Sequence, residues 1–468
     1  MKKIFYILII AISGNLLYSC DDFLTRTPST SVTEEEAFET ASDFENAMHG
    51  VYYNLGTYRF LGRDVLAIGE APSDVTTHSA ATTHFLNIFN YQILATNLYL
   101  SEIWEYGYKA IAGSSRIIEA GENLPEDFPA YDVPIVETQL AQAYALRALT
   151  TFYLTNIFGL PYSDANKSTL GVVNVTKPVK PFENVARATL EENYTHILTD
   201  IAKAKEYFGK DGVEALSYAY MNETALYAFE ARVKLYLKDY DGAIEAANTA
   251  ISLRQGVIVS TPDGYRNMYR SLAASSEDIF YIAKSEDNYL SANSYNTLFN
   301  NYGLAVSGDV KAEFAANDIR LALIEGRGGK MAGIYTNDQV SNLPVFRLPE
   351  QYLILAEAYA LKQTPDYTEA IKNLLEVASK RNGLDESNIP ETADILDLIL
   401  NERKLELLQE GHRYFDLRRL RLKATVSDGR YSDFEIYDFV YPVPVSEVNA
   451  GFGVIQTEGW SNNLPKTQ

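Results

Sequence analysis

The sequence predicts a mostly α-helical protein built as a scaffold of helical repeats joined by long loops. Apolar residues recur at helical spacing over most of the chain after residue 33, and Gly, Pro and Asn are concentrated between the periodic stretches. Two segments, "YLKDYDGAIEAANTAI" and "LKQTPDYTEAIKNLLEVA", both place Asp-Tyr at a turn and Ala-Ile on the following helix. Each follows an alanine-rich helix, and small residues let facing helices approach closely. This pattern is typical of tetratricopeptide-like helix pairs.

The composition sets the size of the core and excludes one class of partner. The chain has 468 residues, of which 47% are apolar, so it can bury a large hydrophobic core. Its formal net charge is -22, and no run of five or more basic residues interrupts the acidic surface. Because a polyanion is repelled by such a surface, we expect no nucleic-acid partner.

The N-terminus predicts export and a lipid anchor. Residues 1–19 have two early lysines and then an apolar stretch, which is too short to span a bilayer and is typical of a signal peptide. Cys20 is the only cysteine, and it stands at the expected cleavage point, as in a bacterial lipoprotein lipobox. We therefore expect lipidation at Cys20, followed by a polar tether over residues 20–32.

The helices are predicted in order along the chain. The first begins at a capping box formed by Thr33 and Glu36. The spacing predicts further helices near residues 98–121, 135–158, 188–208, 222–253, 349–381 and 392–411. The intervening segments are too long for plain connections, so we expect them to carry function; they are residues 56–97, 159–187, 255–348 and 420–468.

The stretch "NERKLELLQEGHRYFDLRRL", residues 401–420, combines many charges with a short apolar stripe. Glu402 lies within that stripe and Glu406 at its margin. A buried carboxylate is costly unless it is paired, so we expect these two to meet nearby guanidinium groups. The predicted structural ion-pair cluster is Glu402, Arg403, Glu406, Glu410, Arg413, Asp416 and Arg418, with Arg419 as a further source of positive charge.

A catalytic alternative would make Glu406 and Glu410 an acid/base pair, as in a glycosidase. Several arginines lie close in the sequence, and these should lower both carboxyl pKa values rather than separate them as such catalysis requires. We therefore favour the structural role. Gly411 is expected to end the helix, and a protonated His412 would gain from the helix dipole there.

Several segments in a fixed order give the chain a family resemblance. They include "DFENAMHGVYYNL", "IWEYGYKAIAGSSRII", "QAYALRALTTFYLTNIFGLPY", "RLPEQYLILAEAYA", "NERKLELLQEGHRYFDLRR" and "VYPVPVSEV". Together with the lipobox, they resemble the SusD/RagB family of Bacteroidetes surface lipoproteins, which bind nutrients, usually glycans. The chain departs from the family pattern at Tyr414, where a tryptophan is frequent.

The resemblance implies the architecture and the partner. Residues 33–468 would form a single SusD-like domain with four tetratricopeptide-like helix pairs, minor β structure and ligand-binding loops. The protein would sit as a hinged lid on a SusC-like TonB-dependent transporter, held at the outer membrane by its lipid anchor. It would bind its ligand without making or breaking bonds, so we expect no enzyme activity and no cofactor.

Two loop segments are the best candidates for ligand contact. Sugars stack their C–H faces on aromatic rings, and this chain has 34 Tyr but only 2 Trp, so we expect a platform of Tyr and Phe. The alternative is that these side chains pack the loops on the helices. The candidate ligand-binding residues are Tyr289, Asn293, Tyr295, Asn296 and Tyr302 in one loop, and His84, Phe85, Asn90 and Tyr91 in the other.

Other functions remain open or are not supported. The ligand could be a peptide, as in the RagB branch, and a glycoside hydrolase is the less favoured alternative. The five histidines are scattered, with no His-x-x-x-His pair and no thiol partners, so we predict no metal site.

Overall fold

The computed structural model describes residues 37–463 apart from 286, 325–339, 390–393 and 425–435. The described chain is mostly helical, which confirms the predicted fold class. That residues 33–468 form one domain, and that each helix pair follows the tetratricopeptide pattern, remain predictions.

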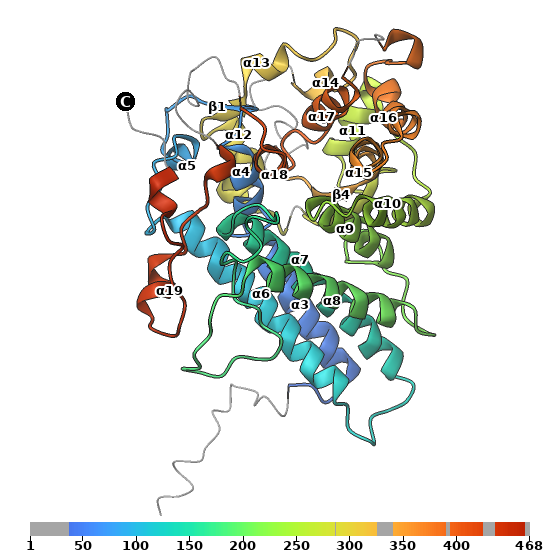
Figure 1. The fold of residues 1–468 in the computed structure, drawn as a ribbon. Coiled ribbons are helices and arrows are strands. Elements are labelled where there is room, and N and C mark those ends of the chain that lie inside the picture. The colour runs from blue at the N-terminus through green and yellow to red at the C-terminus, as the bar shows by residue number, and fades with distance from the viewer. Residues whose placement is uncertain (1–36, 286, 325–339, 390–393, 425–435, 464–468) are drawn as a thin grey trace, which may run out of the picture.

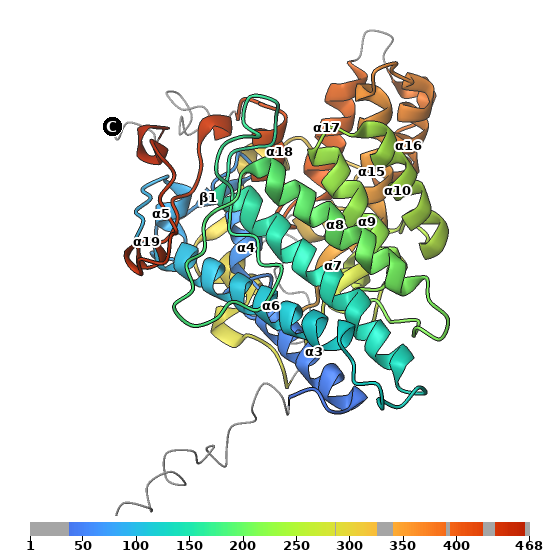
Figure 2. The same ribbon diagram turned by 60° about the horizontal axis from the view of Figure 1, so that its bottom comes forward.

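Four long helices form the lower part of the molecule and run side by side (Figures 1 and 2). They are α3 (Ala41–Gly56), α6 (Leu98–Glu122), α7 (Val133–Phe158) and α8 (Leu190–Phe208). Every residue of α7 from Thr138 to Phe158 is buried, so this helix is the centre of the lower part. A helix that is surrounded by other helices is buried on every side, as α7 is here.

The remaining pairs continue the packing. They are α9 (Glu223–Tyr236) with α10 (Tyr240–Arg254), and α15 (Leu348–Leu361) with α16 (Tyr367–Arg381), followed by α17 (Ile395–Glu406). α10 packs on α15 through a cluster rich in alanine that includes Ala243, Ala247 and Ala358. The small side chains found in the two similar segments therefore lie where two helix pairs meet.

The helix starts are set by side-chain caps. The Asp of each repeated Asp-Tyr pair is an N-cap: Asp239 accepts from the backbone N–H of Gly242 at 3.1 Å, and Asp366 from that of Glu369 at 3.1 Å. The first described helix begins behind Thr40, whose backbone N–H donates to Asp43 at 2.8 Å. The predicted box of Thr33 and Glu36 lies outside the described residues.

The long connections contain short elements. The first has α4 (Asp64–Glu70), β1 (Thr76–His78) and α5 (Leu86–Phe89). The second has α11 (Pro262–Arg270), β2 (Asp278–Ile282), η1 (Ser291–Asn293), α12 (Tyr295–Asn300), β3 (Leu304–Val306), α13 (Gly308–Lys311), α14 (Leu321–Ile324) and β4 (Leu343–Arg347). The C-terminal part has α18 (Arg413–Arg419), η4 (Ile436–Asp438), α19 (Val445–Asn449) and η5 (Trp460–Asn463).

Two small antiparallel sheets join segments that are distant in the sequence. β1 pairs with β3, with Thr76 opposite Val306, and β2 pairs with β4, with Ile282 opposite Leu343. The β2–β4 pair also packs on α9. As a result the segment after β2 is held close to the C-terminal end of α3, where a cavity opens.

Candidate functional site

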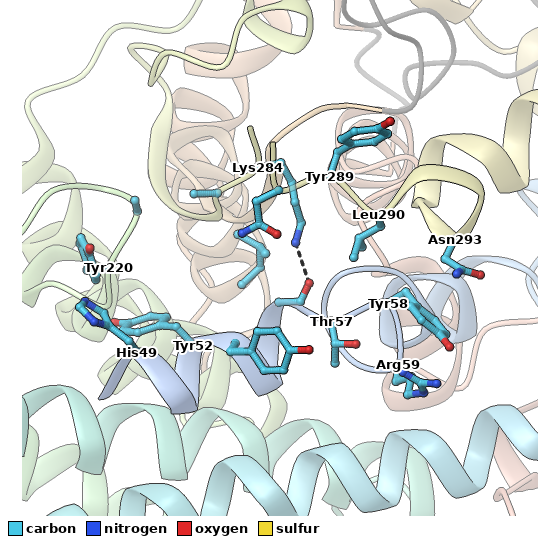
Figure 3. Close-up of a pocket in the computed structure, with 16 residues that line it drawn as sticks. His49, Tyr52, Thr57, Tyr58, Arg59, Tyr220, Lys284, Tyr289, Leu290 and Asn293 are labelled. Atoms are coloured by element: carbon cyan, nitrogen blue, oxygen red, sulfur yellow. Dashed lines mark hydrogen bonds between the residues drawn. The ribbon is translucent and has the colours of Figure 1, made fainter. Parts of the chain in front are cut away.

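A cavity of about 590 Å³ lies between the end of α3, the segment after β2 and the loop before α9 (Figure 3). We call it the tyrosine cavity. Its described lining residues are His49, Tyr52, Tyr53, Gly56, Thr57, Tyr58, Arg59, Ala219, Tyr220, Ile282, Ala283, Lys284, Asn288, Tyr289, Leu290 and Asn293. Its volume is in the range of small-molecule binding sites.

Tyrosine rings from three separate segments surround the cavity. The side chains of Tyr53 and Tyr289 are 75% and 36% exposed, so a ligand can reach both rings. Tyr52 is more fixed: its hydroxyl donates to Gln142 at 2.7 Å and accepts from the backbone N–H of Met221 at 2.8 Å. The cavity therefore has a rigid aromatic floor and more accessible rings at its margin.

Two cations flank the ring of Tyr58. The guanidinium carbons of Arg59 and Arg63 lie 4.3 Å and 4.6 Å from the ring centroid. Arg59 also pairs with Glu102 at 2.8 Å, and Arg63 with Asp64 at 2.6 Å. These contacts hold the turn after α3 in place and fix the position of Tyr58 in the cavity wall.

Lys284 is the polar group that reaches from the opposite wall. Its Nζ donates to the backbone carbonyl of Gly56 at 2.7 Å, which joins the segment after β2 to the end of α3 (Figure 3). Burial lowers the pKa of Lys284 to about 8, since the charged form loses hydration there. At neutral pH the ammonium group is still mostly protonated.

The arrangement offers the contacts that a bound sugar needs. Exposed tyrosine rings offer surfaces for the C–H faces of a sugar, and Lys284, Asn288 and Asn293 offer hydrogen bonds to hydroxyl groups. Glycoside hydrolysis needs two carboxyl groups on either side of the scissile bond. Among the described lining residues there is neither Asp nor Glu.

The structure brings some of the predicted ligand residues to this cavity and separates others from it. Tyr289 and Asn293 line the tyrosine cavity. His84 and Tyr302 are half-buried and stack on each other, with ring centroids 3.8 Å apart and an interplanar angle of 5°. They lie beside the β1–β3 pair, and Asn90 is exposed after α5.

For four of the predicted ligand residues, burial argues against a role in ligand contact. Phe85 and Tyr295 are 0% exposed, Asn296 is 1% exposed and Tyr91 is 3% exposed, so none presents a surface to a ligand. Phe85 stacks on Tyr99, and the hydroxyl of Tyr91 donates to the carbonyl of Pro72. These side chains pack the loops on the frame, as the alternative interpretation required.

Sequence reasoning missed most of the residues that form the cavity. Tyr52 stands at helical spacing with the apolar residues of the first helix, a position typical of the core, and Tyr53, Tyr58 and Arg59 follow it closely. The available signal was the density of aromatic and cationic residues where that helix ends. Lys284 carries no such signal, because the sequence does not show that it reaches α3.

The charged stretch at residues 401–420 lies in the interior, away from the described lining of the tyrosine cavity. Glu402 and Glu406 are 5% and 0% exposed, and both meet guanidinium groups. Glu402 pairs with Arg320 at 2.7 Å, and Glu406 pairs with Arg347 and Arg381, each at 2.9 Å. We call the set Glu277, Asp318, Arg320, Arg347, Arg381, Glu402, Glu406 and Glu410 the arginine–carboxylate cluster.

The expected sources of these guanidinium groups were wrong. Arg403 pairs with Asp416 at 2.8 Å and Arg413 with Asp74 at 2.7 Å. The other two nearby arginines also have different partners. Arg418 donates to the carbonyls of Asn156 and Gly159, and Arg419 pairs with Glu357 and Asp416. The partners of Glu402 and Glu406 come instead from positions that are distant in the sequence or lie on other elements.

The lowered pKa that the sequence predicts for Glu406 is confirmed, whereas the pKa of its neighbour Glu402, for which the sequence predicts no shift, is raised. Burial by itself would raise the pKa of Glu406, but Arg381, Arg347 and Arg320 outweigh it and hold that pKa well below its usual range. Burial raises the pKa of Glu402, and its main cationic partner, Arg320, only partly offsets this. The difference follows from the number of guanidinium groups around each carboxylate.

Gly411 and His412 differ from the prediction. The helix ends at Glu406, and Gly411 stands in a following turn with φ of 79°. His412 then precedes α18 at its N-terminal side, so it does not gain from a helix C-terminus. Burial, together with Arg232 and Arg403, holds the pKa of His412 well below its usual range, and the ring stays neutral.

The lipid anchor and the absence of a metal site stay predictions. Cys20, the signal segment and the tether lie outside the described residues. Within the described part of the chain, no helix has both the length and the apolar character that a bilayer crossing requires. The same part contains no group of three or more His, Cys, Asp or Glu side chains placed to hold a metal ion.

Comparisons with known proteins cover both halves of the chain. A family model described as "Starch-binding associating with outer membrane" matches residues 22–235, and one described as "SusD family" matches residues 274–460. Two SusD-like proteins of Formosa agariphila are 24% and 23% identical to this chain. These matches span 89% and 90% of this chain, and 91% and 90% of the relatives.

Solved structures share the fold. A SusD superfamily protein of Bacteroides thetaiotaomicron matches with a TM-score of 0.78 and 24% identity, over 89% of this chain and 99% of that one. A protein of Bacteroides vulgatus described as a putative sugar binding protein matches with a TM-score of 0.79 and 24% identity, over 91% of this chain and 99% of that one.

Proposed function

The chain belongs to the SusD/RagB family, and from this premise we propose that it is a glycan-capturing lipoprotein of the outer-membrane surface. It binds an oligosaccharide or polysaccharide and passes it to a SusC-like TonB-dependent transporter. The observation that carries this proposal is the tyrosine cavity, whose accessible rings and hydrogen-bond donors suit sugars. The family descriptions, which mention starch binding and the outer membrane, support the same role.

The role requires no catalysis. The two carboxylates that a hydrolase would use, Glu406 and Glu410, are buried among arginines in the interior. The tyrosine cavity offers no carboxylate among its described lining residues. We therefore propose that the protein captures glycans without cleaving them, and we expect glycans to be recovered intact after incubation with it.

Binding is tested by calorimetry of the mature protein against a panel of glycans and a pool of peptides. We expect heat only with glycans, and about fivefold to tenfold weaker binding in Tyr289→Ala, since one stacked ring contributes about 1–1.4 kcal/mol. Tyr367→Ala is the matched control, because Tyr367 is 52% exposed at the start of α16. A response to peptides alone would contradict glycan capture and favour a RagB-like peptide-binding role.

The anchor and the partner need separate experiments in cells. Cys20→Ala should release the protein from the outer-membrane fraction, and protease treatment of intact cells should cut the wild type. Affinity purification of the wild type from detergent-solubilised membranes should recover a TonB-dependent transporter. Protection from the protease on intact cells would refute the surface location, and purification without any such transporter would refute the proposed partner.

A further inference from the structure

The charge of the tyrosine cavity differs from that of the whole chain. The chain contains 62 acidic and 40 basic residues. The described lining of the cavity contains two cations, Arg59 and Lys284, but neither Asp nor Glu. Arg63 lies just behind the wall, where its guanidinium contacts the ring of Tyr58. The cavity is therefore a cationic region of an acidic protein.

Most cations near the cavity already have a carboxylate partner. Arg59 pairs with Glu102 at 2.8 Å, and Arg63 pairs with Asp64 at 2.6 Å. These two arginines hold the turn after α3 and are partly neutralised by their partners. They contribute to the local field, but a carboxylate already balances the charge of each.

Lys284 is different. It is half-buried, and its Nζ donates to a neutral acceptor, the carbonyl of Gly56. Within the described part of the chain, no carboxylate lies at ion-pair distance from it. An ammonium group has three N–H donors, so the bond to Gly56 leaves further donors for a ligand. Holding a cation in this way is costly, as the lowered pKa of Lys284 shows, and a bound anion would offset the cost.

We propose that the tyrosine cavity selects an acidic glycan, whose carboxylate or sulfate ester pairs with Lys284 while a sugar ring packs on Tyr289. This inference rests on the proposed function, because it takes the ligand to be a glycan. Lys284 and Tyr289 come from the same segment after β2 and both line the cavity, and the Lys284 side chain reaches to the end of α3 (Figure 3). A glycan in the cavity can therefore meet the charge and the ring with its own residues. A neutral sugar would leave the ammonium group uncompensated.

The test uses matched pairs of glycans that differ only in charge. One pair is an oligogalacturonate and its carboxyl-reduced product, and the other is a sulfated galactan oligosaccharide and its desulfated product. The affinities for both members of each pair, and for a wider set of neutral glycans, are measured by calorimetry at low and high salt. The two pairs distinguish a carboxylate from a sulfate as the anionic group.

The variants are Lys284→Met, Lys284→Arg and Lys109→Met. Lys284→Met removes the charge and should weaken acidic-glycan binding about tenfold to a hundredfold, the usual effect of losing one charge-assisted hydrogen bond. Lys284→Arg keeps a cation and should recover part of the affinity, which shows that the loss does not come from misfolding. Lys109→Met makes the same charge change on α6, where Lys109 pairs with Glu105 at 2.6 Å, and should leave binding unchanged.

The outcomes separate this inference from the proposed function. Tighter binding of the charged member of a pair, weakened by salt and by Lys284→Met, supports the inference. Equal or tighter binding of neutral glycans overturns the inference but supports glycan capture. Acidic-glycan binding that is lost in Lys109→Met and kept in Lys284→Met also overturns it, because the anion would then lie elsewhere. If no glycan binds and only peptides do, both proposals fail.

Discussion

Replacing Glu406 by Gln should strongly destabilise the protein without affecting any chemistry. The side chain is fully buried and accepts from three arginines. Its oxygens meet Arg347 at 2.9 Å, Arg381 at 2.9 Å on each oxygen, and Arg320 at 3.2 Å. An amide retains one acceptor oxygen, but it points an NH₂ group at a guanidinium group and removes the negative charge.

The magnitude follows from what the substitution leaves behind. Breaking a buried ion pair by removing one partner costs about 3–5 kcal/mol, because the remaining charge stays buried. The three arginines keep other partners: Arg320 still has Glu402, and both Arg347 and Arg381 still have Glu277. We therefore expect a loss of about 3 kcal/mol for Glu406→Gln, at the lower end of that range.

The assay is urea unfolding followed by circular dichroism, with Glu376→Gln on the exposed face of α16 as the control. The folded pKa of Glu406 is lowered, so its contribution is complete above its unfolded pKa and is lost as the pH falls toward the folded value. The stability gap between wild type and Glu406→Gln should therefore narrow below about pH 4.5. A variant as stable as wild type that had lost a measurable glycan-cleaving activity would refute this reasoning and reopen the case for an enzyme.

Four further predictions concern the frame. Gly69→Ala should cost at least about 3 kcal/mol in urea unfolding, because the new Cβ would stand 2.1 Å from the carbonyl oxygen of Gly411. Gly50→Ala, with no atom within 4 Å of its Cβ, should instead raise the stability by up to about 1 kcal/mol. The pKa of His412 is lowered in the folded state, so its contribution to the free energy of unfolding is complete above its unfolded pKa of about 6.5. Below that pKa the contribution falls by about 1.4 kcal/mol per pH unit. The difference in stability between wild type and His412→Gln should therefore narrow between pH 7 and pH 5, as measured by unfolding. Arg187 donates to five oxygens from residues 158–171 and 455–457, so Arg187→Met should lower the stability by about 2–4 kcal/mol and speed proteolysis of residues 159–187.

The parts of the fold that depend on local pattern could be predicted from the sequence. The helix at Leu98–Glu122 was expected at 98–121, and the one at Val133–Phe158 at 135–158, because periodicity reports directly on a helix. The ends were less predictable: the last predicted helix stops at Glu406, because a turn with Gln409 and Gly411 at positive φ follows it.

The partners across the fold could not be predicted in the same way. Arg347 is 59 residues from Glu406, and Arg320 is 82 residues from Glu402, so nothing in the local sequence joins them. The loop aromatics show the same limit. Asn293 reaches the cavity while Tyr295, two residues later, is completely buried, and composition alone does not distinguish the two. Burial in a loop depends on which frame surface the loop crosses, which is a tertiary property.

The arginine–carboxylate cluster and the tyrosine cavity are physically connected through β2. Glu277 immediately precedes that strand, and it accepts from Arg347 on β4 at 2.9 Å and from Arg381 on α16 at 2.7 Å. The same strand leads directly to Lys284, whose ammonium group bonds to the end of α3. A weaker cluster should therefore loosen the wall that carries Lys284 and Tyr289, even though no cluster residue is among the described lining of the cavity. Buried charge in this protein therefore has a structural role that reaches beyond the cluster: it holds one wall of the tyrosine cavity against α3, a helix from the other end of the chain, and a wall fixed in advance lowers the cost of binding for any ligand that enters.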